Sequence, residues 1–169
     1  MADAIRFVLT NIPSILFILA LAIPTIWRIE PFGHRYLSWI LLLSVGVEMI
    51  WAGFFHVFFP AIAAAQIGWQ VSPFQFEIGV ADLSAGIVAV IAFWRSLAFK
   101  SAIVCYVVLF YIGVAIGHVR EAVTAGDFAP DNFGPLLLMT VLKVGLLSFL
   151  LWKAWQEEDE LVPARSLSR

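Results

Sequence analysis

The candidates for chemistry are ionisable side chains that fall inside otherwise apolar stretches of the sequence. They are Glu48, His56, Glu77, Asp82, His118, Glu121 and Lys143. A charged group in hydrocarbon is costly, so such residues rarely face lipid and usually mark a site where they meet a partner. A helical rise of about 1.5 Å per residue sorts them into two depths. Four of them form an outer layer and three lie near the midplane.

The outer layer consists of His56, Glu77, His118 and Glu121. His118 and Glu121 are three residues apart, the reverse of the Glu-x-x-His order in carboxylate bundles that bind paired iron or manganese. Imidazole and carboxylate ligands suit iron, manganese or zinc, so we predict that this layer binds one of these metals. The alternative is hydrogen bonding at headgroup depth without a metal. Haem between the two histidines is disfavoured, because carboxylates are poor neighbours for a porphyrin.

Two further polar residues are expected to support the outer layer. Tyr111 precedes His118 by seven residues and therefore lies on roughly the same helical face, where it could hydrogen-bond to the ligands. Gln75 lies two residues before Glu77 at the start of the same predicted helix.

The midplane layer consists of Glu48, Asp82 and Lys143. Lys143 is embedded in the apolar stretch 136–151, from which its amine cannot easily reach either interface. We therefore expect it to pair with Glu48 or Asp82. The carboxylate left over must be protonated, metal-bound or hydrated, because an isolated buried charge is unfavourable. Such a group could serve a proton relay or a purely structural ion pair, and both interpretations stay open here.

The composition identifies the environment of these residues. Of 169 residues, 62% are hydrophobic and 13% are charged, with a mean hydropathy of +0.96. Soluble domains are roughly half apolar and a quarter charged, so this chain is expected to have the lipid bilayer as its partner. A net charge of -2 gives no reason to expect nucleic acid. The acidic run 157–160 is interpreted as a solvated face.

The elements that must position the candidates are predicted as membrane-spanning helices. Stretches long and apolar enough occur at about 5–27, 36–59, 74–94, 101–123 and 133–155. The fold class is therefore all-α, a polytopic transmembrane helical bundle of about five helices, with four forming a core. Residues 1–155 make one domain, followed by a polar cytoplasmic tail at 156–169. The apolar start resembles a signal peptide but lacks a positive leader, so we expect a retained first helix.

The distribution of Lys and Arg predicts the orientation. One side of the predicted bundle receives Arg28, Arg35, Arg95, Lys100, Lys153, Arg165 and Arg169, and the other receives only Arg6 and Arg120. Positive residues are retained in the cytoplasm, so the N-terminus is expected outside and the C-terminus inside. This describes a multi-pass protein of the bacterial inner membrane.

Two features bear on how the helices meet. Small residues are expected to allow close helix contact. They are Gly46, Gly53, Gly79, Ala81, Ser84, Gly86, Gly113, Gly117 and Gly145. The uncharged segment 60–71 is expected either to prolong the second helix after a proline kink or to lie flat in the interface.

Three motifs carry a resemblance to a known family. They are Phe-Gln-Phe-Glu-Ile-Gly-Val-Ala-Asp at 74–82, Gly-His at 117–118, and Phe-Ala-Pro-Asp-Asn-Phe-Gly-Pro at 128–135. Over about residues 45–150 the chain resembles a bacterial family of small membrane proteins of unknown function, distantly similar to DoxX-like four-helix proteins. The resemblance implies a membrane bundle with Glu77, Asp82 and His118 at polar motif positions. By analogy, the DoxX similarity implies an association with redox or quinone chemistry.

Three functions follow as hypotheses. The first is a membrane-embedded metal-binding protein, redox-active if the metal is iron or manganese. The second is a small proton-coupled transporter or channel that uses Glu48, Asp82 and Lys143. The third is an accessory subunit of a larger membrane complex, or a homo-oligomer, whose polar groups only hold helices together. No phosphate-binding glycine loop or nucleophile motif decides whether the protein is an enzyme.

Overall fold

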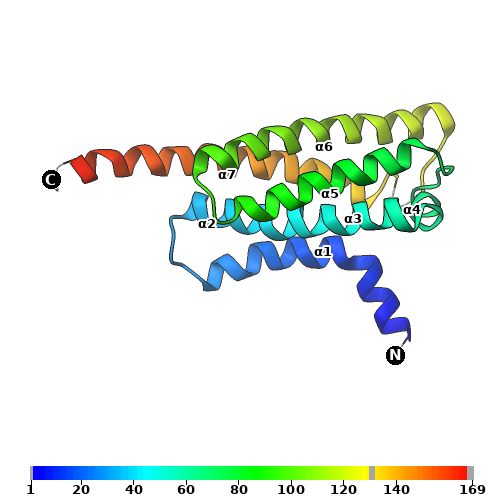
Figure 1. Ribbon diagram of the computed structural model, residues 1–169, viewed down its shortest axis with the longest axis horizontal. Helices are drawn as coiled ribbons and strands as arrows, with labels where there is room; N and C mark the ends of the chain where they lie inside the picture. Colours follow the sequence, from blue (N-terminus) through cyan, green and yellow to red (C-terminus); the bar gives the residue numbers. More distant parts are fainter. Residues whose placement is uncertain (1, 130–131, 167–169) are drawn as a thin grey trace.

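The computed structural model is an all-α bundle whose long helices lie side by side along one axis (Figure 1). It describes residues 2–129 and 132–166, with side chains described for 11–129 and 132–160. The elements are α1 (Ala2–Ile26), α2 (Phe32–Trp39), the π-helix η1 (Ile40–Val47), α3 (Glu48–Phe58), α4 (Pro60–Ile67), α5 (Phe74–Ala92), α6 (Leu97–Ala125) and α7 (Pro135–Ser166).

Four helices in the described part of the chain are long and apolar enough to cross a membrane. They are Phe32–Phe58, Phe74–Ala92, Leu97–Ala125 and Pro135–Glu160. They correspond to the second to fifth predicted spans. The first predicted span lies within α1, of which the described apolar part, Asn11–Ile26, is shorter than a full crossing.

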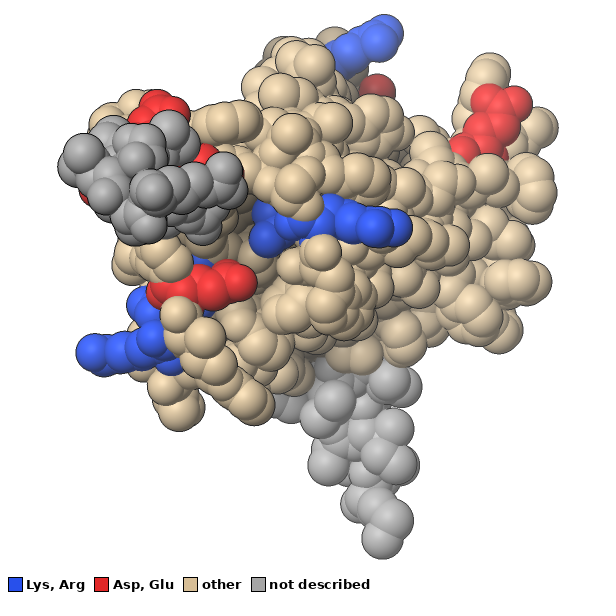
Figure 2. All heavy atoms as spheres, turned by 60° about the vertical axis from the view of Figure 1, so that its left-hand side comes forward, with Lys and Arg blue, Asp and Glu red and all other residues tan. Residues whose placement is uncertain are grey.

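The surface fits a lipid environment. Large apolar side chains are exposed on several helices, including Leu109 at 71% and Leu138 at 60%. The face drawn in Figure 2 is formed mostly by residues other than Lys, Arg, Asp and Glu. Since a water-soluble bundle would not expose so much apolar surface, the chain is a membrane protein.

Elements α2, η1 and α3 run together as one helix, which we call the central helix (Phe32–Phe58). Its side chains at Leu37, Ile40, Leu41 and Val45 are completely buried, so this helix forms the middle of the core. α1, α5 and α7 pack around it, and α6 packs on α7. The π-helical stretch ends immediately before Glu48, and π-helical turns occur frequently at functional sites.

Glycines bring the central helix and the antiparallel α5 into backbone contact at two levels. A Cβ atom added to Gly53 would lie 2.7 Å from the carbonyl oxygen of Gly79. One added to Gly86 would lie 2.8 Å from the carbonyl oxygen of Gly46. Only glycine allows such an approach, and this confirms the expected role for these four small residues. Gly113, by contrast, has open space around its Cα within the described residues.

Helices α6 and α7 present buried faces with the alternating three- and four-residue spacing of coiled coils. On α7 the buried positions are Thr140, Lys143, Leu147, Leu150, Ala154 and Glu157. On α6 they include Leu97, Lys100, Val104, Val107, Tyr111 and His118. Polar side chains therefore occupy core positions of the same two faces, which directs them into the bundle.

Short or polar helical segments lie at both ends of the bundle. At one end, segment 60–67 forms the short helix α4 (Pro60–Ile67), which begins at a proline after Phe59 and is capped by Gly68 with a φ of 77°. The positive φ explains the glycine. At the opposite end, α7 continues as a helix through residues 156–166, within the segment predicted as a polar cytoplasmic tail.

Candidate functional site

A buried ion pair joins the central helix to α7. The Lys143 amine donates a hydrogen bond to Glu48 Oε1, and the two side chains are 3% and 11% exposed. Lys143 Nζ also lies 5.6 Å from the centre of the Tyr111 ring, a cation–π distance. The sequence left either Glu48 or Asp82 as the partner of Lys143, and the structure pairs it with Glu48.

Asp82 of α5 lies beside this ion pair without joining it. Its carboxyl is close enough to Glu48 for their charges to interact. Tyr111 is close enough to interact electrostatically with both carboxylates. Asp82 is 7% exposed and makes no hydrogen bond or ion pair within the described residues. We call Glu48, Asp82, Tyr111 and Lys143 the central polar cluster. Its members come from α3, α5, α6 and α7.

Two oxygen atoms on the central helix are buried and have no hydrogen-bond partner in the described part of the structure. They are Glu48 Oε2 and Ser44 Oγ. Ser44 lies four residues before Glu48, in the π-helical stretch in the middle of the same helix. Buried polar atoms are nearly always paired, so these two oxygen atoms are exceptions that call for an explanation. The polar face therefore extends from Glu48 towards the α2 end of the bundle.

His118 is held by an asparagine at the α4 end of the bundle. Its Nδ1 atom lies 2.6 Å from Asn132 Oδ1, and Asn132 Nδ2 donates to the carbonyl oxygen of Asp127 at 2.7 Å. This second bond fixes the amide orientation, so the oxygen of Asn132 faces the histidine and can only accept. His118 Nδ1 therefore carries a proton and donates it to Asn132. The Trp69 ring lies 5.6 Å from the imidazole.

The four predicted metal ligands are not brought together. The described residues contain no group of three or more His, Cys, Asp or Glu side chains that could hold a metal ion. His56 accepts a hydrogen bond from Gln75 at 3.3 Å, and His118 is held by Asn132. Glu77 is exposed and Glu121 is half-buried. Binding of iron, manganese or zinc at this layer stays a prediction, with haem the less favoured alternative.

The α2 end contains buried polar contacts that the sequence analysis missed. Lys100 is 5% exposed, and its amine donates to Ser38 Oγ at 2.6 Å. Glu157 accepts hydrogen bonds from the backbone N–H of Gly33 at 3.0 and 2.8 Å, where its charge also suits the start of α2. The interpretation of 157–160 as a solvated face is therefore wrong for Glu157, which is 9% exposed. Lys143, Leu150 and Glu157 are spaced seven residues apart and therefore lie on one face of the helix. This spacing was the sequence feature that could have predicted the burial of Glu157.

Comparison with known proteins places the chain in a family. The sequence model of a family of unknown function, DUF6790, matches residues 8–160. The chain belongs to this family. The match covers the four spanning helices and every member of the central polar cluster, and it agrees with the expected uncharacterised family. Similarity to DoxX stays a prediction. No curated protein and no solved structure matches the chain.

Proposed function

We propose that the protein is a small proton-coupled transporter whose proton-binding site is the central polar cluster. The observation that carries this proposal is Asp82, a buried carboxyl beside a buried ion pair and without a bonding partner of its own in the described residues. Carboxyls in this position inside membrane bundles are typical of proton relays.

Charge balance explains why such a cluster would hold an exchangeable proton. Lys143 balances one carboxylate only, and the cluster contains two. Two like charges repel strongly in a medium of low dielectric constant, so the favoured state has one protonated carboxyl. The proton can reside on Asp82 or move to Glu48 when Lys143 shifts towards Asp82. Movement of the proton between the two carboxyls keeps the cluster neutral, whereas release of the proton leaves one carboxylate unbalanced, so the cluster favours its proton-bound state.

Polar side chains on both sides of the cluster suggest the proton's route. Towards the α4 end, Thr140 is buried on α7 three residues before Lys143, and His118 lies seven residues beyond Tyr111 on the same face of α6. Towards the α2 end, Ser44 and then the Ser38–Lys100 pair continue the series. Seven helical residues span about 10 Å, so water or side-chain motion must connect these groups.

Proton uptake by liposomes tests the proposal. The purified protein is reconstituted with an internal pH dye, and a potassium gradient with valinomycin drives proton entry. We expect uptake with the wild-type chain and loss of uptake with Asp82→Asn. Glu77→Gln is the matched control, because this carboxyl lies on the same helix but is exposed. Absence of uptake with the wild-type chain, or equal loss in both variants, would contradict the proposal.

Infrared spectroscopy gives a second readout that does not depend on transport. We expect the absorption of a protonated carboxyl in the wild-type protein at neutral pH. The band should shift or disappear in Asp82→Asn and persist in Glu77→Gln. A wild-type spectrum without a protonated carboxyl at neutral pH would contradict the charge-balance argument.

A further inference from the structure

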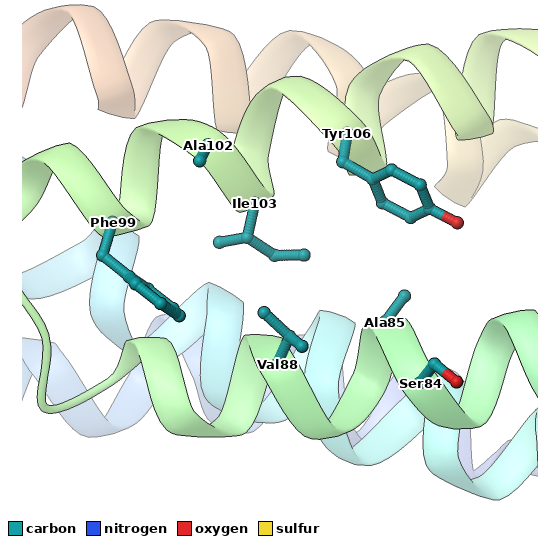
Figure 3. A pocket seen from close by; sticks show the side chains of 7 residues that line it. All are labelled: Ser84, Ala85, Val88, Phe99, Ala102, Ile103 and Tyr106. Atoms are coloured by element: carbon teal, nitrogen blue, oxygen red, sulfur yellow. The ribbon is translucent and has the colours of Figure 1, made fainter.

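A groove opens at the surface of the bundle between α5 and α6, two helices that are long and apolar enough to span the membrane. It has a volume of about 440 Å³, within the roughly 300–1,000 Å³ of small-molecule sites. Ala85 and Val88 of α5 and Phe99 and Ile103 of α6 form most of its lining (Figure 3). Ile103 and Ala85 are each 6% exposed and form the floor, while Val88 and Phe99 are more exposed. The groove carries no charged side chain among its lining residues.

The only hydroxyl groups among the described lining residues lie at one end of the groove. The hydroxyls of Ser84 and Tyr106 both point towards this end, and Phe99 lies at the other (Figure 3). Ser84 Oγ already donates its proton to the Val80 carbonyl at 2.7 Å, so it can only accept another hydrogen bond. Tyr106 has no hydrogen-bond partner within the described residues and is free to donate. A hydroxyl group, which both donates and accepts, matches the two.

The hydroxyl end of the groove is the end closest to the central polar cluster. Ala85 is one helical turn from Asp82 on the same face of α5. On α6, the Tyr106 ring stacks on Phe110 at 6.1 Å, and Phe110 contacts the Tyr111 ring at 6.2 Å. A molecule seated in the groove would therefore direct its polar end towards Asp82 and its apolar body towards Phe99.

We propose that this groove binds neutral, lipid-soluble alcohols that enter sideways from the bilayer, and that they are the substrate class of the proton-coupled site. The absence of charge in the described lining excludes an ionic ligand, the apolar floor favours an aliphatic or aromatic body, and the hydroxyl pair selects an alcohol over a plain acyl chain. The assignment as substrate rests on the proposed function, whereas binding itself does not.

Photolabelling with 3-azioctanol, a neutral aliphatic alcohol with a photoreactive diazirine, tests binding directly. The wild-type protein in lipid nanodiscs is labelled at increasing concentrations, and labelled residues are located by peptide mass spectrometry. We expect saturable labelling of the α5 and α6 residues that line the groove, displaced by unlabelled octanol. Label spread without saturation over lipid-facing residues of all helices would overturn the proposal. Groove labelling by a diazirine phospholipid chain that octanol cannot displace would also overturn it.

Two variants of α6 distinguish labelling in the groove from labelling elsewhere on the helix surface. Ala102 lines the groove and is exposed, so Ala102→Phe fills the space without disturbing the core and should weaken labelling at least about fivefold. Cys105→Phe is the matched control, because Cys105 is exposed on α6 outside the groove. Equal labelling of the Ala102→Phe and wild-type proteins would overturn the site.

Removal of the hydroxyls tests the selection of an alcohol. Tyr106→Phe should weaken labelling by roughly threefold to tenfold through the loss of one hydrogen bond. The corresponding diazirine alkane without a hydroxyl should label the wild-type groove as weakly as the alcohol labels this variant. Equal labelling by alkane and alcohol would overturn the alcohol assignment. Saturable labelling without proton uptake would refute the proposed function and leave the binding site, whereas uptake without saturable labelling would refute the site.

Discussion

The central polar cluster predicts an asymmetry between removing its amine and removing one of its carboxylates. Breaking a buried ion pair from one side leaves an uncompensated charge and costs about 3–5 kcal/mol. Lys143→Met leaves both Glu48 and Asp82 without a cation, so we expect this full cost in the free energy of unfolding at pH 8. In Glu48→Gln, Asp82, which lies beside Glu48, can balance the amine once the Lys143 side chain shifts towards it, so the expected cost is about half as large.

Combining the carboxylate changes sharpens this prediction. The double variant Glu48→Gln with Asp82→Asn removes both partners of Lys143 and should cost as much as Lys143→Met. In each single variant the remaining carboxyl can replace the missing one as the partner of Lys143. The loss in free energy of unfolding of the double variant should therefore exceed the sum of the two single losses by more than about 1 kcal/mol. Lowering the pH should restore stability to Lys143→Met, since protonated carboxyls need no cation.

Unfolding of the purified protein in mixed micelles, followed by far-ultraviolet circular dichroism, measures these free energies. Lys153→Met is the control, because Lys153 lies on the same helix, is only half-buried and has no ion pair among the described residues. It should change stability by less than about 0.5 kcal/mol. Equal costs for Lys143→Met and Lys153→Met, or strict additivity of the carboxylate changes, would refute the reasoning.

Further predictions concern the helix contacts and the two ends of the bundle. Gly53→Val should destabilise the protein by about 1–3 kcal/mol, because the added side chain collides with the backbone of α5. Gly113→Ala should stabilise it by about 0.5–1 kcal/mol, because the added methyl group meets open space and alanine favours the helix. Unfolding in micelles measures both effects. Glu157→Gln should cost about 1 kcal/mol and speed amide hydrogen exchange at the start of α2; unchanged exchange would contradict its capping role. Nitrogen NMR should find the His118 proton on Nδ1, and a mixture of both tautomers in Asn132→Leu. A wild-type signal for a proton on Nε2 alone would contradict the assigned hydrogen bond.

The sequence contained enough information for the spanning helices and for the existence of a buried lysine–carboxylate pair. Apolar runs of sufficient length have one stable form in lipid, the helix, which is why four of the five predicted spans lie nearly at the positions of the observed spanning helices. Lys143 could be recognised because no interface lies within reach of its side chain. Depth along a helix follows directly from residue number.

The face of a helix that packs against its neighbours does not follow from residue number, and the outer residues illustrate this. His118 and Glu121 share a depth, yet His118 is buried against a loop asparagine and Glu121 is not. The role of Asn132 could not be predicted from the neighbouring sequence, because it depends on a tertiary contact that brings Asn132 onto His118 of α6. Glu157 was misread because three further acidic residues follow it, and only its spacing from Lys143 and Leu150 distinguishes it from them.

The glycine contacts between the central helix and α5 have a mechanical consequence. Two backbones that touch at Gly46–Gly86 and Gly53–Gly79 have no layer of side chains across which to slide, so the two helices must move as one rigid body. Helices α6 and α7 meet that body through a shared apolar core and through polar contacts, Lys143 on Glu48 at the centre and Glu157 on Gly33 at the α2 end. The interface between the two halves therefore includes the ion pair itself, and if the cluster transfers a proton as proposed, the transfer would weaken one of the contacts that hold the two halves together.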